Sequence, residues 1–337
     1  MSASSLPIAH RSENNTSAKL RRFVSSNSTL LVAIALFLFF SLTAQPFSTP
    51  NNVFNIVRQM SVVAVLAIGM TLVILIGGID LSVGSNLFLA CGITAVLLDR
   101  GTPAVTAIAL GLLASSLVGL LNGLLVEIAG ISPVIATLGT LIGVRGLALV
   151  YMNNAQIRVT DAFFEWVAIT RIFPIPSANI TGFPLIGVIV LVLFLIFALV
   201  MRWTIYGRYV YAIGGNETAA RLCGVPVKFV KVCTYVLCGF LAGIGGMLMA
   251  ASTGIVSPGL GAGSEFYTIA AVMLGGASLT GGIGRVEKTL IGAFILYMVL
   301  NYMTIRRIPT EWQQAATGLL VLVVIVSNRF AGRSKPS

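Results

Sequence analysis

The stretch LIGVIVLVLFLIFALVM at residues 185–201 is apolar on every side, as is LVAIALFLFF at 31–40. Neither stretch alternates between apolar and polar residues, which is the pattern of a strand in a membrane barrel. A helix satisfies its backbone hydrogen bonds internally, and about 20 apolar residues are enough for it to cross a bilayer. Both stretches therefore predict membrane-spanning helices.

Runs of the same kind recur along the whole chain of 337 residues, which is 57% hydrophobic and only 9% charged. A soluble domain carries about 25% charged residues, because its surface must face water. Ten apolar runs can be drawn, at about 29–45, 56–77, 82–98, 104–126, 133–150, 183–201, 230–252, 266–280, 289–303 and 313–327. We therefore expect an all-α, polytopic transmembrane protein of about ten spans.

The charged residues indicate how the spans are oriented. With the N-terminus placed inside, fourteen of the 21 Lys and Arg residues lie inside, six lie outside and Arg145 lies within a span. Because inside loops carry the excess of cations, we expect an even number of spans with both termini cytoplasmic. The connection 151–182 is then outside and the connection 202–231 inside. The net charge of +11 reflects this orientation rather than nucleic-acid binding.

Two polar segments flank the membrane part of the chain. Residues 1–28 are rich in Ser and Asn, a composition that indicates a flexible cytoplasmic arm. Residues 328–337 form a short cytoplasmic tail. We assign residues 29–327 to one transmembrane domain, which includes the cytoplasmic segment 202–231.

The sequence lacks the signatures of enzymes and of metal sites. His10 is the only histidine, which excludes a Ser-His-Asp triad and a multi-histidine metal site. The stretch GIGRVEKT at 282–289 superficially resembles a phosphate-binding loop, but Glu287 stands where that loop has its second glycine. We therefore expect no catalytic residue, no cofactor and no ATP hydrolysis on this chain.

The motif GGIDLSVG at 77–84 places the carboxyl group of Asp80 in an otherwise apolar stretch. A carboxylate at membrane depth is costly, so it should face protein, water or a helix N-terminus. Two interpretations stay open. Asp80 caps the following span through its backbone N–H groups, or Asp80 and Ser82 lie on a translocation path and bind hydroxyl groups of the substrate.

A second motif, AIGGNETAARLCGVPV at 212–227, lies in the inside connection. Asn216 is a suitable N-cap, and Gly224 can end a helix in the left-handed conformation, so we expect a helix over 216–224. The other residues that we expect to make its contacts are Glu217, Ala219, Ala220 and Arg221.

This short helix either docks into the groove of a partner or lies in the membrane interface. In the docking interpretation, the small side chains of Ala219 and Ala220 let the helix sit deep in the groove. Arg221 then pairs with a carboxylate of the partner, and Glu217 contacts the rim of the groove.

A third motif, AAVMLGGASLTGGIG at 270–284, ends in glycines and hydroxyl groups. The apolar run 266–280 is short, so we expect it to be partly re-entrant or shielded by neighbouring helices. Ser278 and Thr280 are candidates for the translocation path. Pairs of glycines at span ends indicate either close helix packing or broken helices beside a transport path. These pairs are Gly77-Gly78, Gly245-Gly246, Gly275-Gly276 and Gly281-Gly282.

The three motifs, in this order and spacing, resemble the permease subunits of bacterial ABC importers for ribose, arabinose, galactose and similar sugars. The resemblance covers about residues 30–330 and implies the ABC importer permease fold in the bacterial inner membrane. It also implies a cytoplasmic ABC ATPase subunit, a periplasmic sugar-binding protein, and a second permease copy or paralogue. In this family the helix at 216–224 is the coupling helix that contacts the ATPase. Lys288 departs from the pattern, because such permeases usually have glycine there.

The resemblance implies a permease that translocates a monosaccharide. The alternatives are a permease for branched-chain amino acids or nucleosides, and a secondary transporter that works without an ATPase. An amino-acid path needs a counter-charge for each end of the zwitterion, and the ionisable residues within the spans are few: Asp80, Arg145 and Glu127. The sequence does not distinguish which sugar is carried.

Overall fold

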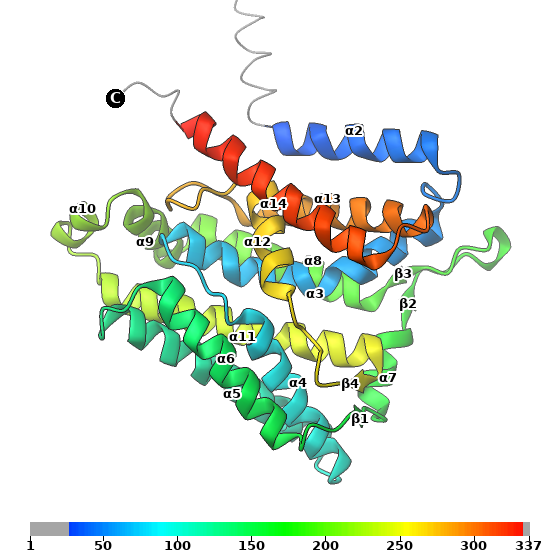
Figure 1. Cartoon of the computed structure of the whole chain (residues 1–337), viewed down its shortest axis with the longest axis horizontal. Helices are drawn as coiled ribbons and strands as arrows, with labels where there is room; N and C mark the ends of the chain where they lie inside the picture. Colours follow the sequence, from blue (N-terminus) through cyan, green and yellow to red (C-terminus); the bar gives the residue numbers. More distant parts are fainter. Residues whose placement is uncertain (1–26, 333–337) are drawn as a thin grey trace, which may run out of the picture.

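A computed structural model describes residues 27–332, and thirteen α-helices make up most of this part of the chain (Figure 1). Six helices are long and apolar enough to cross a membrane: α3 (Pro50–Leu75), α5 (Ala104–Glu127), α6 (Pro133–Tyr151), α8 (Leu185–Trp203), α11 (Val227–Thr253) and α13 (Val286–Ile305). The other predicted runs carry α2 (Ser28–Thr43), α4 (Val83–Asp99), α12 (Ser264–Leu274) and α14 (Thr310–Gly332). The chain is therefore a polytopic helical membrane protein. Residues 1–26 of the predicted arm and 333–337 of the predicted tail lie outside the described residues, and helix α14 includes residues 328–332 of that tail.

The long connections hold regular structure that the sequence analysis did not anticipate. The fold is predominantly helical, as predicted, and two short antiparallel ladders supplement the helices: β1 (Ile157–Arg158) pairs with β4 (Ile255–Val256), and β2 (Arg171–Ile172) pairs with β3 (Phe183–Pro184). The connection 151–182 also contains α7 (Ala162–Ile169), and a short 3-10 turn follows β2. The inside connection contains α9 (Ile205–Gly215) and α10 (Glu217–Leu222).

Helix α3 lies at the centre of the bundle. Its C-terminal half is buried on all sides, from Ser61 to Leu75, apart from the half-buried Val62. It packs against α8, α11, α12 and α13. A helix that is apolar on every side needs such surroundings, because neighbouring helices or lipid must cover each face.

Close approach of α5 and α11 depends on small residues. A Cβ built on Gly123 would lie 2.9 Å from Cα of Val232, and one built on Gly239 would lie 3.0 Å from Cα of Gly119. Glycine at these positions lets the two backbones come together, which is how helices associate inside lipid. Gly246 plays the same part toward Leu87 of α4, with its Cβ position 2.5 Å from the Leu87 carbonyl oxygen. Here the close-packing interpretation is confirmed for the pair Gly245-Gly246.

The third motif forms a short helix and an irregular segment instead of a continuous span. Helix α12 has 11 residues, which rise about 16 Å and cannot cross a hydrocarbon core of about 30 Å. It is shielded by α3, α13 and α14. Residues 275–285 then follow an irregular course, with left-handed backbone at Gly281 and Gly282. For this part of the chain, the broken-helix interpretation is the correct one.

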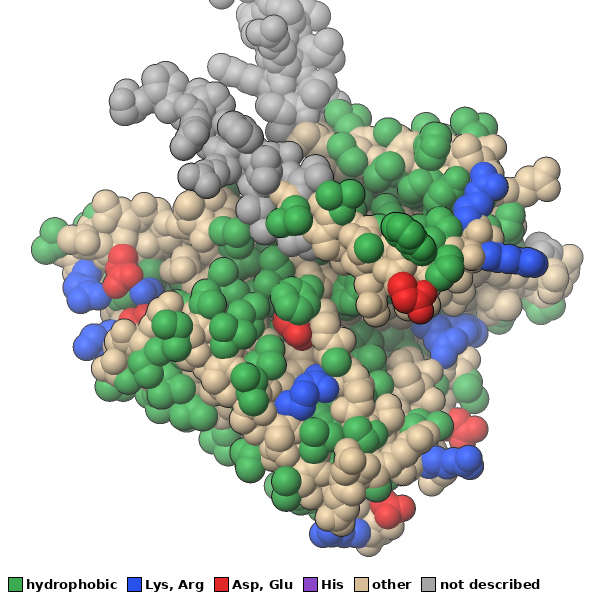
Figure 2. Space-filling model, in the orientation of Figure 1, with side chains coloured by type: hydrophobic (Ala, Val, Ile, Leu, Met, Phe, Trp, Pro, Cys, Tyr) green, Lys and Arg blue, Asp and Glu red, His purple; other side chains and the backbone are tan. Residues whose placement is uncertain are grey.

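The bundle has two distinct ends and an apolar flank. Helix α14 runs back toward the side of α9 and α10, whereas α7, β2 and β3 lie at the opposite end (Figure 1). Figure 2 shows hydrophobic side chains over the middle of one face and most charged side chains near the two ends. Strongly exposed apolar residues include Leu42, Val105, Ile142 and Val150. Lipid is the solvent that such a surface requires.

Candidate functional site

The three glycine-rich motifs meet at one place in the structure. The amide of Gly282 donates to the carbonyl of Leu75 at 2.9 Å. A Cβ built on Gly281 would lie 3.1 Å from the amide nitrogen of Gly77 and 3.2 Å from the carbonyl oxygen of Gly214. We call these four glycines, Gly77, Gly214, Gly281 and Gly282, the glycine junction. It joins the break between α3 and α4, the end of α9, and the irregular segment after α12.

Helix α10 extends from this junction with the ends that the sequence predicted. The side chain of Asn216 accepts a hydrogen bond from the Ala219 amide at 3.0 Å, which is N-cap geometry. Gly224 is left-handed, with φ of +82°. The amide of the next residue, Val225, donates to the carbonyl of Ala220 at 3.1 Å and closes the last turn. The helix itself covers Glu217–Leu222, within the predicted range 216–224.

The faces of α10 differ from the expectation at one residue. Ala220 is 5% exposed and belongs to the main hydrophobic core, so it faces its own chain and not a partner. The prediction that Ala220 sits in a partner's groove is therefore wrong, because the short helix must bury one face against the bundle to hold its position. Ala219 is exposed, and Leu222 is 85% exposed. The outer face of α10, which consists of Thr218, Ala219, Leu222 and Cys223, is free to make contacts.

Ion pairs connect α10 to two spanning helices. Lys231 of α11 lies 2.7 Å from Glu217 and 2.9 Å from Glu127, the last residue of α5. We call Glu127, Glu217 and Lys231 the charge triad. Lys231 and Glu127 are only 14% and 8% exposed, whereas Glu217 is 40% exposed. The hydrogen bond from Lys231 lowers the pKa of Glu217, so this carboxyl group is ionised at neutral pH.

Arg221 is also engaged within the chain. Its guanidinium lies 2.8 Å from Glu217, one helical turn earlier, and its side chain is 58% exposed. Both side chains stay partly exposed, so contacts of Arg221 and Glu217 with a partner remain a prediction. A cavity of about 540 Å³ opens beside the charge triad and the glycine junction, and Thr280 lines it.

Asp80 and Ser82 lie in a buried polar cluster, and both are fully inaccessible. Oδ1 of Asp80 accepts from the amide of Ser82 at 2.9 Å, from the Ser82 hydroxyl at 2.6 Å, and from Asn122 of α5 at 3.4 Å. Asn122 in turn accepts from the Thr140 hydroxyl of α6 at 2.7 Å. The cluster thus fixes the break before α4 against α5 and α6.

The cap interpretation for Asp80 needs one correction. Ser82 occupies the N-cap position of α4, and Asp80 binds the amide of Ser82 rather than an amide of the first helical turn. Asp80 Oδ2 and the Tyr235 hydroxyl are buried without a hydrogen-bond partner among the described residues. Tyr235 lies beside Gly78, since a Cβ there would be 2.6 Å from its hydroxyl oxygen.

We predict that Asp80→Asn assembles and transports within about twofold of wild type, because asparagine keeps the acceptor that the cluster uses. By contrast, Asp80→Ala leaves the amide and the hydroxyl of Ser82 without their acceptor, at about 1–3 kcal/mol for each buried group, whereas Asn122 keeps its 2.8 Å bond to the Ser82 hydroxyl oxygen. The measurement is uptake in membranes with matched amounts of protein. Normal assembly with lost uptake in Asp80→Asn would assign the charge to the substrate path.

The candidate path residues do not converge. Asp80 and Ser82 are sealed in the polar cluster, whereas Ser278 and Thr280 lie in the segment after α12. The hydroxyls of Ser278 and Thr280 are 2.7 Å apart, and Thr280 is exposed. Of these four residues, Thr280 lines an open space, the cavity at the α10 end of the bundle.

A cavity of about 580 Å³ lies toward the opposite end, between α3, α11, α12 and α13, and we call it the outer cavity. It is lined by groups that hydrogen-bond well to hydroxyls, namely Asn55, Arg58, Gln59, Ser257, Tyr267 and Tyr297. Arg58 is held in place by a 3.1 Å bond to the carbonyl of Ser252. Apolar side chains, Val62 and Met249 among them, complete the wall.

Several site residues were missed by sequence reasoning. Lys231 was counted only as an inside cation, and Glu127 only as a sparse intramembrane charge. Glu265 was not noted, although it is 7% exposed in the first turn of α12. Arg145 donates to the carbonyl of Leu260 at 3.4 Å and lies 5.3 Å from the centroid of the Phe88 ring. An acidic or basic residue inside an apolar run was the available signal in each case.

The chain is a helical bundle with an apolar flank and broken helices, and ion pairs tie its exposed helix α10 to two spanning helices. These features are those of a multi-pass membrane permease. No group of residues that could hold a metal ion occurs in the described part of the chain. The family described as "Branched-chain amino acid transport system / permease component" matches residues 52–325, and the chain belongs to this family. The protein is thus a multi-pass protein of the bacterial inner membrane.

Named relatives match the chain over nearly its whole length. The ribose import permease protein RbsC of Escherichia coli K12 is 36% identical over 314 residues, which cover 92% of this chain and 95% of the relative. The D-allose transport system permease protein AlsC of the same strain is 33% identical, and the match covers 90% of this chain and 91% of the relative. The L-arabinose ABC transporter permease protein AraH of Azospirillum brasilense is 31% identical, and the match covers 92% of this chain and 89% of the relative. No solved structure shows a significant match.

Proposed function

We propose that this chain is the membrane-spanning subunit of an ATP-driven importer that carries a monosaccharide across the inner membrane. The relatives named for ribose, allose and arabinose support the substrate class over branched-chain amino acids or nucleosides. Lys231 and Glu127 are paired with each other and are therefore not available to bind a charged substrate. An uncharged sugar needs hydrogen-bonding groups like those of the outer cavity.

The outer face of α10 is the observation that carries the coupling part of the proposal. A separate cytoplasmic ABC ATPase hydrolyses ATP. The conformational change of the ATPase must be transmitted to the permease through a protein–protein contact. Helix α10 presents an exposed, apolar Leu222 and is tied to α5 and α11 by the charge triad. A single residue, Asn216, separates it from the end of α9, next to the glycine junction. Movement of α10 is therefore passed to both breaks in the spanning helices.

Two further partners complete the assembly. A periplasmic sugar-binding protein delivers the substrate to the end that bears α7 and the outer cavity. A second permease copy or a paralogue frames the path, because the outer cavity opens at the surface of a single chain. Ser278 and Thr280 then lie toward the release end of the path.

The test is reconstitution of this chain in vesicles with a cytoplasmic ABC ATPase and a periplasmic sugar-binding protein from the same organism. We expect one sugar of a panel of ribose, arabinose and allose to stimulate ATP turnover and to accumulate in the vesicles. Leucine and adenosine serve as matched non-sugar probes. Stimulation by leucine or adenosine alone, or uptake that needs an ion gradient and no ATP, would overturn the proposal.

We also propose ten spans with both termini in the cytoplasm, which predicts the result of reporter fusions. A fusion after Gly215 should report a cytoplasmic location, and one after Asn154 should report a periplasmic location. The reasons are the excess of cations at the α10 end and the position of α7 at the opposite end of the bundle (Figure 1). A periplasmic signal at Gly215 would contradict the ten-span topology.

A further inference from the structure

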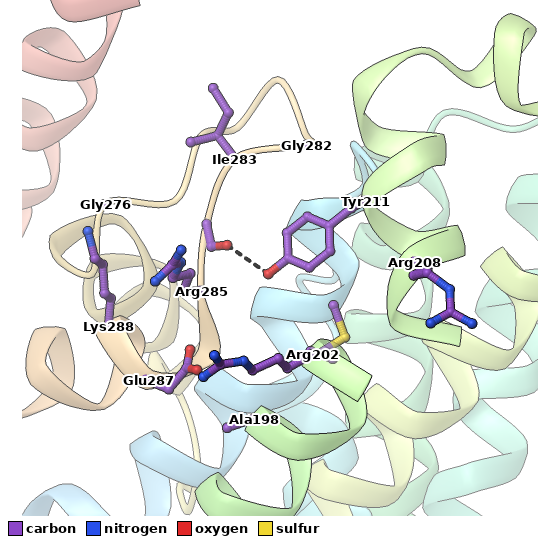
Figure 3. Close-up of a pocket in the computed structure, with 12 residues that line it drawn as sticks. Ala198, Arg202, Arg208, Tyr211, Gly276, Gly282, Ile283, Arg285, Glu287 and Lys288 are labelled. Atoms are coloured by element: carbon purple, nitrogen blue, oxygen red, sulfur yellow. Dashed lines mark hydrogen bonds between the residues drawn. The ribbon is translucent and has the colours of Figure 1, made fainter. Parts of the chain in front are cut away.

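A cavity of about 770 Å³ lies between α8, α9 and the start of α13, beside Gly282 of the glycine junction. Four cations line it, from three segments of the chain: Arg202, Arg208, Arg285 and Lys288. Glu287 is the one carboxylate among its lining residues. We call it the basic cavity. Figure 3 shows Arg202 reaching from the α8 side toward Glu287 and Arg285, with Arg208 on the far side of Tyr211.

The three arginines of the basic cavity are available to bind an anion. Among the described residues, no carboxylate lies within 4.0 Å of the guanidinium of Arg202, Arg208 or Arg285. The wall between them is fixed, because the Tyr211 hydroxyl donates to the carbonyl of Gly284 at 2.9 Å (Figure 3). A preformed hollow lined by several unpaired guanidinium groups is suited to phosphate, which accepts bidentate hydrogen bonds from arginine.

An apolar track leads from the basic cavity along the outside of α8. The residues Leu191, Val192, Leu195, Ile196 and Leu199 are 44–60% exposed and recur at helical spacing on one face. Arg202 follows Leu199 by three residues and so continues that face at the cavity. Trp203, 73% exposed, marks the depth where aromatic residues meet the membrane interface.

We propose that the basic cavity binds the head group of an anionic phospholipid, whose acyl chains lie along the outer face of α8. The cations neutralise the phosphate, and the apolar track holds the hydrocarbon. A free phosphate ion uses only the first of these features, and an acidic protein surface cannot follow the track into the membrane. The inference rests on the membrane location of the chain and is independent of the transported substrate.

Native mass spectrometry of the purified chain, equilibrated with equal amounts of phosphatidylglycerol and phosphatidylcholine, tests the proposal. Wild type should retain phosphatidylglycerol in preference to phosphatidylcholine. The variant Arg202→Gln/Arg285→Gln should lose this preference by about fivefold for each cation removed. The matched control Arg100→Gln/Arg307→Gln removes two exposed arginines at the opposite end and should keep the preference.

Three results would overturn the proposal. One is equal retention of both lipids by wild type. Another is an unchanged preference in Arg202→Gln/Arg285→Gln, with the single variant Arg202→Gln measured where the double variant is not monodisperse. The third is loss of the bound phosphatidylglycerol on addition of excess inorganic phosphate, which would assign the cavity to a free anion. Retention that withstands inorganic phosphate supports a lipid site.

Discussion

Replacing Ala219 by tryptophan is expected to abolish substrate-stimulated ATP turnover while the protein accumulates in the membrane at its normal level. Ala219 is exposed on the outer face of α10. It contributes only its backbone amide to the Asn216 cap, so a change of its side chain leaves the cap in place. A large side chain in a packed contact costs about 1–3 kcal/mol, which weakens association of the ATPase by up to about a hundredfold. The measurements are copurification of the ATPase and ATP turnover in reconstituted vesicles.

Two control variants make this prediction specific to the outer face of α10. Ala155→Trp adds the same bulk at an exposed alanine of the connection at the opposite end of the bundle and should leave coupling intact. Ala220→Trp adds it on the buried face and should lower the amount of folded protein, because Ala220 packs in the core. If Ala219→Trp retains both copurification and ATP turnover, α10 does not transmit the power stroke.

The ends of α10 were predictable from the sequence, whereas its faces were not. Capping by Asn216 and termination at Gly224 depend on residues within one turn of the helix. The side that Ala220 presents to the bundle depends on where α9 and α11 lie, and this is a tertiary property. A six-residue helix has too few residues for a hydrophobic pattern to distinguish the buried side from the exposed one.

Helix α9 shows a second limit. The sequence analysis ended the sixth span near Met201 and treated the following residues as a connection. The structure continues after a single extended residue, Thr204, whose hydroxyl accepts from the Gly207 amide at 3.3 Å and caps a new helix. The residues Gly207, Gly214 and Gly215 lowered the expected helix propensity. Burial of Val210 and Ile213 against the bundle overrides that local preference.

The span count depended on length, which is why α12 was treated as an uncertain span. The run 266–280 looks continuous because Gly275 to Thr280 contains small residues that a hydropathy window accepts. The backbone leaves the helix there, since Gly276, Gly281 and Gly282 adopt positive φ. A glycine that ends a helix cannot be told apart in the sequence from a glycine that lets two helices pack closely, such as Gly246. Only the neighbouring elements separate the two uses.

The charge triad was invisible in the sequence because its members are far apart along the chain. Lys231 follows Glu217 by 14 residues and Glu127 by more than a hundred, so no helical spacing relates them. What the sequence offered was a lysine near the start of an apolar helix, which is equally typical of a cation that reaches the interface. The pairing follows from the packing of α5 against α11, which the glycines of both helices permit.

Replacing Lys231 by methionine is expected to have the second large effect, on both folding and coupling. The change leaves the Glu127 carboxylate, 8% exposed, without a counter-charge, and removing one partner of a buried pair costs about 3–5 kcal/mol. We therefore expect little folded protein, measured as the monodisperse fraction extracted from membranes. Glu127→Gln/Lys231→Met should restore that fraction, because no buried charge remains. Uptake should stay low in this double variant, since α10 has lost its link from Glu217 to α11. Glu217→Gln, which keeps the buried pair, should likewise fold normally and transport poorly. Full uptake by both folded variants would show that the triad stabilises the fold without taking part in coupling.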